Sequence, residues 1–263
     1  MFTAGNANLN TAAVTVEEQR DSGALCRISE GLCLFLDVDG TLLEFTESPD
    51  GISADKELHD LLQGAKIATS GAVALVSGRS LAQIDRIFAP ELWPAAGLHG
   101  LERRDASGRV HRQPLAPGQF DVALRAFQRI ANHHAGIDIE DKGLTIALHY
   151  RRAPELEASL VEEVQHVADE LGGGYHVQRG SCVLEIRPVG ATKGDAIDAF
   201  LAEAPFAGRR PAYAGDDLTD LGAFEAVERA GGLSMAVGGR VHAMLNFPTV
   251  MHFRRYLSGL VQS

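Results

Sequence analysis

The segment Leu32–Thr41, with the sequence LCLFLDVDGT, joins a run of five apolar residues to a turn that carries two aspartates. A continuous apolar run of this length is typical of a strand that is buried on both faces of a parallel sheet. A similar run over Ala72–Val76 ends at Ser77, and shorter ones cover Ala212–Ala214 and Leu233–Val237. These four segments predict the buried strands of one parallel sheet.

Helices are predicted between these strands, over Leu81–Phe88, Lys193–Ala202 and Asp220–Arg229. The alternation of buried strands and helices predicts an α/β fold with a doubly wound, mostly parallel sheet. Ligands of such sheets bind beyond the carboxyl ends of the strands. Acidic and hydroxyl residues follow that end of several predicted strands, so we expect the functional site there.

The stretch from Gln113 to Pro188 has a different pattern, with a helix, two strands, a helix and two strands in succession. Turn residues at Asp141–Gly143, Gly172–Gly174 and Gly180–Ser181 favour hairpins over crossover connections. We therefore predict a small antiparallel α+β module inserted into the core. Its predicted helices are Phe120–His134 and Glu155–Leu171, and its predicted strands are Ile137–Glu140, Leu144–Tyr150, Tyr175–Arg179 and Cys182–Arg187.

The length of 263 residues suits one core with a sizeable insertion. We predict a catalytic core over 30–112 and 189–263 and an inserted cap over 113–188. Residues 1–29 are rich in Ala, Asn, Thr and Gly without sustained periodicity, so we expect a loose N-terminal tail.

The composition narrows the class of protein. A formal net charge of -11 disfavours nucleic acid or an anionic membrane as the main partner. The odd count of three cysteines, with no CxxC pair, disfavours a disulfide framework and a zinc site and suits a reducing compartment. Neither a signal peptide nor an apolar run of about eighteen residues is present, so we expect a cytoplasmic location. The oligomeric state stays open, and a monomer is compatible with the sequence.

Two carboxylates, Asp37 and Asp39, stand at the end of the first predicted strand. One can attack phosphorus, while the other donates a proton to the leaving oxygen and later takes one from water. A plain turn or a calcium-binding loop is the alternative. The calcium loop is disfavoured because Leu42, Leu43 and Phe45 occupy positions where further oxygen ligands should stand.

Three further segments carry polar groups suited to phosphate chemistry. The hydroxyl and backbone N–H groups of Ser77-Gly78-Arg79 can hold a phosphoryl oxygen, although the segment can also be a simple helix cap. Lys193 can reach a phosphate, although a lone lysine is usually a solvated surface charge. Asp216, Asp217 and Asp220 form a repulsive cluster that bound Mg²⁺ would relieve, with a helix N-cap as the alternative for Asp217 or Asp220.

Taken in order, DVDGT, SGR, a lysine and GDD resemble the four signature segments of the haloacid dehalogenase superfamily. The resemblance implies that Asp39 places the chain in the phosphatase and phosphomutase branches, which carry an acid/base at that position. It also implies a cap of the type inserted between the second and third segments, because only Arg79–Lys193 has room for the α+β module. Such caps are typical of sugar phosphatases.

Other segments resemble the trehalose-6-phosphate phosphatases in particular: GLHGLE at Gly97–Glu102, EDKG at Glu140–Gly143, ALHYR at Ala147–Arg151 and LEIRP at Leu184–Pro188. The resemblance implies that cap residues contact the sugar, with ordinary solvation of a strand face as the alternative. The substrate-binding candidates are Gly78, Arg79, His99, Glu140, Lys142, His149, Arg151 and Glu185.

The resemblance also implies the mechanism. Asp37, the backbone carbonyl of Asp39, and Asp216 would hold Mg²⁺, with Asp217 as a further candidate ligand. Ser77 and Lys193 would stabilise the transferring phosphoryl group, so both are candidate catalytic residues beside Asp37 and Asp39. The products would be trehalose and phosphate.

One departure from the family pattern is present. Leu221 and Gly222 stand where the family usually has Glu and a polar residue, so we expect weaker metal binding at most. Two rivals remain: a phosphatase acting on sucrose phosphate, mannosyl phosphoglycerate or a monosaccharide phosphate, and a non-catalytic sugar-phosphate sensor. The presence of both Asp37 and Asp39 disfavours the sensor.

Overall fold

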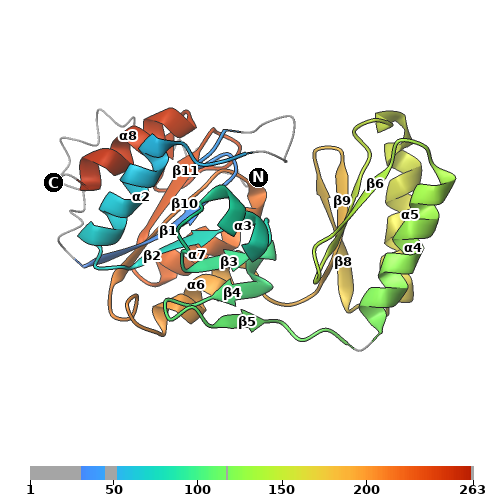
Figure 1. Cartoon of the computed structure of the whole chain (residues 1–263), viewed down its shortest axis with the longest axis horizontal. Helices are drawn as coiled ribbons and strands as arrows, with labels where there is room; N and C mark the ends of the chain where they lie inside the picture. Colours follow the sequence, from blue (N-terminus) through green and yellow to red (C-terminus); the bar gives the residue numbers. More distant parts are fainter. Residues whose placement is uncertain (1–30, 45–51, 117, 262–263) are drawn as a thin grey trace, which may run out of the picture. The chain divides into compact units, whose positions relative to one another are not determined.

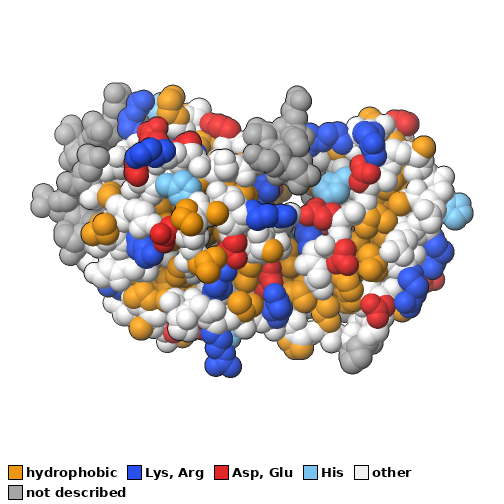
Figure 2. All heavy atoms as spheres, viewed as in Figure 1, with side chains coloured by type: hydrophobic (Ala, Val, Ile, Leu, Met, Phe, Trp, Pro, Cys, Tyr) orange, Lys and Arg blue, Asp and Glu red, His pale blue; other side chains and the backbone are white. Residues whose placement is uncertain are grey.

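The computed structural model describes residues 31–44, 52–116 and 118–261, so the predicted tail over 1–29 lies outside the described residues. The chain divides into two compact units, one comprising Met1–Val73 with Glu203–Ser263 and the other comprising Ala74–Ala202. No helix within the described residues combines the length and the apolar character needed to cross a bilayer. Figure 2 shows a face on which acidic and basic side chains are interspersed rather than gathered by sign.

The first unit is built on four parallel strands in the order β12-β11-β10-β1. Every residue of β1 is buried, which is why its sequence is a continuous apolar run. Pairing of Leu36 with Ala214 brings the carboxyl ends of β1 and β10 to the same edge. The strands are β1 (Leu32–Asp37), β10 (Arg210–Gly215), β11 (Leu233–Val237) and β12 (Leu245–Phe247), and the helices are α2 (Lys56–Ala68), η4 (Leu218–Asp220), α7 (Leu221–Arg229) and α8 (Val250–Val261).

The second unit begins with the strand order β2-β3-β4-β5, in which β2 and β3 are parallel and the later pairs are antiparallel. These strands and their helices place the second and third signature segments: Ser77 follows β2, and Lys193 begins α6. The elements are β2 (Val73–Val76), α3 (Leu81–Ile87), β3 (Ala95–Gly97), η2 (Leu98–Gly100), β4 (Glu102–Arg104), β5 (Val110–Arg112) and α6 (Lys193–Leu201).

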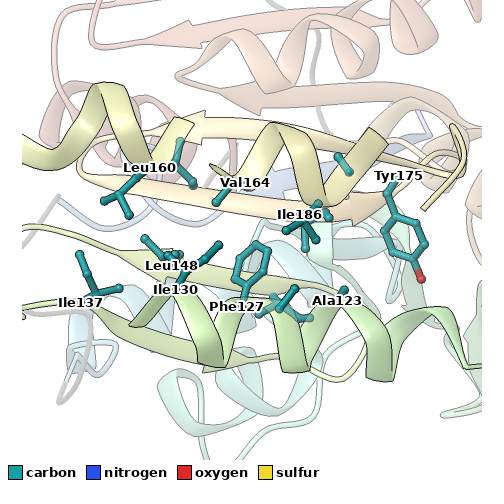
Figure 3. Close-up of a cluster of buried hydrophobic side chains, with 14 of the residues drawn as sticks. Ala123, Phe127, Ile130, Ile137, Leu148, Leu160, Val164, Tyr175 and Ile186 are labelled. Carbon is teal, nitrogen blue, oxygen red and sulfur yellow. The ribbon is translucent and has the colours of Figure 1, made fainter. Parts of the chain in front are cut away.

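The rest of the second unit is an antiparallel sheet with the order β6-β7-β9-β8, packed against two helices (Figure 1). Figure 3 shows Phe127 of α4 and Leu160 and Val164 of α5 among strand residues such as Leu148 and Ile186, in one apolar core. The elements are α4 (Gln119–His133), β6 (Asp138–Asp141), β7 (Ile146–His149), η3 (Pro154–Leu156), α5 (Glu157–Glu170), β8 (Tyr175–Gly180) and β9 (Val183–Pro188).

The face of this sheet away from the helices is polar. Side chains alternate between the two faces of a strand, so residues next to the apolar ones belong to the open face. The register aligns Glu140, Ala147, Glu185 and Gln178 in one row across the four strands. We call this face the open face of the cap sheet.

The predicted α/β fold with a large, mostly parallel sheet and a separate antiparallel α+β module is confirmed. The predicted boundaries at 112/113 and 188/189 stay a prediction, although β6 to β9, α4 and α5 all lie inside them. One arginine of the second unit lies in an unexpected place for a charged residue: Arg104 is buried, and it forms an ion pair with Asp85.

Candidate functional site

Three carboxylates meet at the carboxyl edge of the first unit. Asp37 ends β1, Asp216 follows β10 and Asp220 ends η4, and one oxygen from each lies within 4.8 Å of the others. Their exposed fractions are only 4%, 5% and 0%. Burial, together with these negative charges, raises the pKa of the adjacent Tyr213 well above its usual range. A divalent cation would offset the mutual repulsion of such a cluster.

Asp220 differs from the other two because it braces the turn after β10. Its carboxylate accepts hydrogen bonds from the Tyr213 hydroxyl and from the backbone N–H groups of Asp216, at 2.9 Å, and Asp217, at 3.0 Å. A Cβ at Gly215 would lie 2.4 Å from the Cγ of Asp220, so only glycine admits this contact. Asp220 thereby holds the turn that carries Asp216, and the roles of Asp37 and Asp216 as ligands of a cation stay a prediction.

The turn that carries Asp39 is held by the backbone. The N–H of Gly40, which has φ of 82°, donates to the carbonyl of Leu43 at 2.7 Å, and the N–H groups of Leu42 and Leu43 donate to Val38. Leu42 and Leu43 are buried in the core. They therefore cannot supply ligands in the manner of a calcium loop, and Asp39 is left half-buried at the turn.

The SGR segment of the second unit lies between β2 and α3. The cap of α3 is Ser80, whose hydroxyl and whose partner Gln83 form a capping box. The hydroxyl of the buried Ser77 instead accepts from the backbone N–H of Arg79 at 3.1 Å. The helix-cap alternative therefore applies to Ser80 and not to Ser77.

Residues Gly97–Glu102, which we call the GLHGLE bracket, are tied to the SGR segment. The N–H of Leu98 donates to the carbonyl of Arg79, and the N–H of His99 donates to Ser77, both at 2.9 Å. Leu98 and His99 both have left-handed backbone conformations, with φ of 50° and 57°. Such conformations persist only where surrounding contacts impose them.

The bracket also contacts the start of α6. A Cβ at Gly100, which has φ of +107°, would lie 2.2 Å from the carbonyl oxygen of Thr192. Thr192 is the N-cap of α6 and forms a capping box with Asp195. The bracket therefore connects the SGR segment with the residue that precedes Lys193.

Lys193 is the first residue of α6 and is only 3% exposed. A buried ammonium is costly unless negative groups compensate it. The reading of Lys193 as a solvated surface charge is therefore excluded.

Comparisons with known proteins agree with these motifs. A family model described as trehalose-phosphatase matches residues 35–242. A probable trehalose-phosphate phosphatase of Sinorhizobium fredii is 42% identical over 220 residues, which cover 84% of this chain and 83% of that protein. The trehalose-6-phosphate phosphatase of Escherichia coli K12 is 42% identical over 205 residues, covering 78% and 76%.

This chain belongs to the trehalose-phosphatase family. Among solved structures, one described as a trehalose-6-phosphate phosphatase related protein superimposes with a TM-score of 0.70 at 27% identity, covering 88% of this chain and 97% of that one. The resemblance drawn from the motifs is therefore confirmed, and the chain is a member of a family of phosphoric monoester hydrolases.

The open face of the cap sheet brings together four of the residues predicted from the family resemblance. Glu140 accepts from Gln83 at 2.7 Å and lies 3.1 Å from Nε2 of His149. That imidazole, followed by Lys142, lowers the pKa of Glu140 against the opposing effect of burial. Lys142 donates to the buried Glu185 at 3.2 Å.

Other predicted residues lie elsewhere. Arg151 lies in an exposed turn after β7. Asp217 is outside the group of three carboxylates and lies 3.8 Å from Arg240, so its role as a metal ligand stays a prediction. Leu221 is exposed and a Cβ at Gly222 would meet nothing within 4 Å, so no packing explains this departure from the family pattern.

Sequence reasoning missed two polar residues that contact predicted ones, Gln83 and Gln178, and a third, Arg187, that contacts Gln178. Gln83 binds Glu140, Gln178 lies next to His99, and Arg187 binds Gln178. Arg187 stands inside the LEIRP segment, two residues after Glu185, so strand alternation places it on the same face. Gln178 is detectable only from the strand register, which sets it opposite Glu185.

Proposed function

We propose that this chain hydrolyses trehalose 6-phosphate to trehalose and inorganic phosphate, the final step in making that disaccharide. The observation that carries the proposal is 42% identity to proteins described as trehalose-phosphate phosphatases over about four fifths of the chain. The buried acidic cluster and the buried lysine supply the kinds of groups that phosphoryl transfer needs. A location in the cytoplasm is part of the proposal, in keeping with the free thiols of Cys33 and Cys182.

In the proposed reaction Asp37 is the nucleophile and forms a phosphoaspartate. Asp39 protonates the leaving O6 of the sugar and then takes a proton from the water that hydrolyses the intermediate. The backbone hydrogen bond from Gly40 to Leu43 fixes the turn that carries the half-buried Asp39, which follows the nucleophile by two residues in the sequence. Positioning of this kind can supply a large part of the rate.

The acidic cluster fits a magnesium ion because its donors are carboxylate oxygens, the ligands that this ion prefers. Asp37, the backbone carbonyl of Asp39, and Asp216 would hold it, with Asp220 bracing the turn. When bound, Mg²⁺ supplies positive charge that neutralises the carboxylates and polarises a phosphoryl oxygen. Ser77 and Lys193 would stabilise the charge on the transferring group.

The cap would determine the substrate. Glu140, Lys142 and Glu185 are proposed to bind sugar hydroxyl groups, with His149, Arg151 and His99 as further contacts. Carboxylates and an ammonium on one sheet face offer both acceptors and donors to hydroxyl groups. Contacts remote from phosphorus contribute to the rate by positioning the substrate.

A phosphate-release assay tests the proposal. The wild-type chain, its Asp37→Asn variant and the wild type in EDTA are compared on trehalose 6-phosphate, sucrose 6-phosphate, glucose 6-phosphate and mannosyl phosphoglycerate. The highest kcat/KM is expected on trehalose 6-phosphate, with loss of activity in EDTA and recovery on addition of Mg²⁺. A preference for another sugar phosphate would overturn the substrate, and binding without turnover would favour a sensor.

A further inference from the structure

Three side chains form a line of hydrogen bonds from the cap sheet to the GLHGLE bracket. Arg187 of β9 donates from Nη1 to Oε1 of Gln178 at 2.9 Å and from Nη2 to the carbonyl of Ala191 at 3.1 Å. Nε2 of Gln178, on β8, lies 3.2 Å from Nε2 of His99. Arg187 is buried and Gln178 is half-buried.

The donor and acceptor of each hydrogen bond in this line can be assigned in only one way. A guanidinium only donates, so the amide oxygen of Gln178 must face Arg187. The amide nitrogen then faces His99 and can only donate, which makes Nε2 of His99 the acceptor. A neutral imidazole carries one proton, so the proton of His99 lies on Nδ1.

The surroundings of His99 favour the neutral ring. Burial and the positive charges of Lys193, Arg187, Lys142 and His176 lower the pKa of His99 well below its usual range.

The ring also lies directly against the SGR segment. A Cβ at Gly78 would be 2.6 Å from Nε2 of His99 and 2.7 Å from Cε1. The other ring nitrogen, Nδ1, is buried and has no hydrogen-bond partner among the described residues.

We propose that Gln178 is a positioning residue: from β8 it holds the ring of His99 against Gly78, with the proton on Nδ1. Nδ1 thereby becomes a fixed neutral donor for an oxygen of the substrate. Arg187 acts one step further back, because it sets the orientation of the Gln178 amide. The proposal rests on the proposed function for its effect on turnover, but the tautomer of His99 can be measured without any substrate.

The first measurement is nuclear magnetic resonance of the full chain labelled with ¹⁵N in its histidine rings at pH 7.5. His99→Gln assigns the His99 signals among the ten histidines. Protonated Nδ1 and unprotonated Nε2 are expected in the wild type. In Gln178→Met the proton should move toward Nε2, the form that free histidine side chains favour. A wild-type His99 that carries its proton on Nε2 overturns the proposal and leaves the proposed function intact.

The second measurement is turnover of trehalose 6-phosphate. Gln178→Met should lower kcat/KM about fivefold, the worth of one neutral hydrogen bond. Gln178→Glu keeps an acceptor for Arg187 but cannot donate, so it should draw the proton of His99 to Nε2, raise the pKa of His99 and make kcat pH-dependent between about pH 6 and 8. The exposed Gln128 of α4 provides a matched control, Gln128→Glu, with wild-type turnover expected.

The combined results discriminate between failures. If both Gln178 variants keep the wild-type tautomer and pH profile, the proposal is wrong even if activity falls, since the loss would then be structural. If the wild type does not hydrolyse trehalose 6-phosphate, the proposed function fails and the resonance data still decide the role of Gln178. If the variants do not fold, the wild-type tautomer alone decides it.

Discussion

Replacing Gly100 by alanine should disable the site without touching any reacting group. The new Cβ would start 2.2 Å from the carbonyl oxygen of Thr192, whereas real Cβ atoms stay at least about 3.0 Å away, so the carbonyl must retreat by about 0.8 Å. Thr192 caps α6, and Lys193 is its next residue, so the lysine moves with it. A displacement of about 1 Å in a catalytic constellation can cost about a hundredfold in rate. We therefore expect Gly100→Ala to lower kcat by about two orders of magnitude.

A matched control separates this displacement from backbone strain. Gly108 also has a positive φ, +88°, but its Cβ would meet nothing within 4 Å. Alanine at either position carries a left-handed strain of about 1–2 kcal/mol, which lowers Tm by a few degrees. Only Gly100→Ala should lose turnover, measured as phosphate release from trehalose 6-phosphate and from an aryl phosphate. Turnover by Gly100→Ala within threefold of Gly108→Ala would refute the connection between the bracket and Lys193.

Four further outcomes are expected. Asp37→Asn should abolish phosphate release while circular dichroism stays native, and activity within tenfold of wild type would remove Asp37 as nucleophile. Glu140→Gln should lower kcat/KM for trehalose 6-phosphate about ten- to a hundredfold but spare an aryl phosphate; equal losses on both would contradict a role in sugar binding. The pKa of the buried His99 lies well below 6.5, so the unfolded chain binds one more proton than the folded chain below that pH. The Tm should therefore fall from pH 7 to pH 5, and it should fall less steeply in His99→Gln. An equal fall of Tm in both proteins would contradict the lowered pKa of His99. Burial raises the pKa of Cys33 to about 12, so iodoacetamide at pH 8 should modify it only after denaturation, as read by peptide mass spectrometry.

The sequence predicts those elements whose burial produces a recognisable pattern of neighbouring apolar residues. Strand β1 is buried on both faces and therefore reads as an uninterrupted apolar run. Strands β3 and β4 read as AAG and ERR, which carry no such run, and they were missed. Arg104 in β4 can be buried because Asp85 and the carbonyl of Trp93 accept its hydrogen bonds. These partners lie about ten to twenty residues away in the sequence, so the residues around Arg104 do not predict its burial.

The candidate site divides in the same way. Carboxylates directly after buried strands were predictable, because the ends of neighbouring parallel strands must meet at one edge. Gln83 and Gln178 were not predictable, since a glutamine on a helix or an edge strand reads as a solvated residue. Their partners, Glu140 and His99, are 57 and 79 residues away. Only the strand register and the packing of the bracket bring them together.

The glycines of two motifs are required because neighbouring side chains lie too close for a Cβ atom. In SGR, a side chain at Gly78 would overlap the ring of His99, and in GDD, a side chain at Gly215 would overlap the carboxylate of Asp220. Neither His99 nor Asp220 needs to react, because one lies against the SGR segment and the other holds the turn of Asp216. The motifs therefore encode fixed surroundings as well as reacting groups. Groups that are fixed before reaction need no reorganisation when charge develops, and that fixed arrangement is the property that electrostatic catalysis requires.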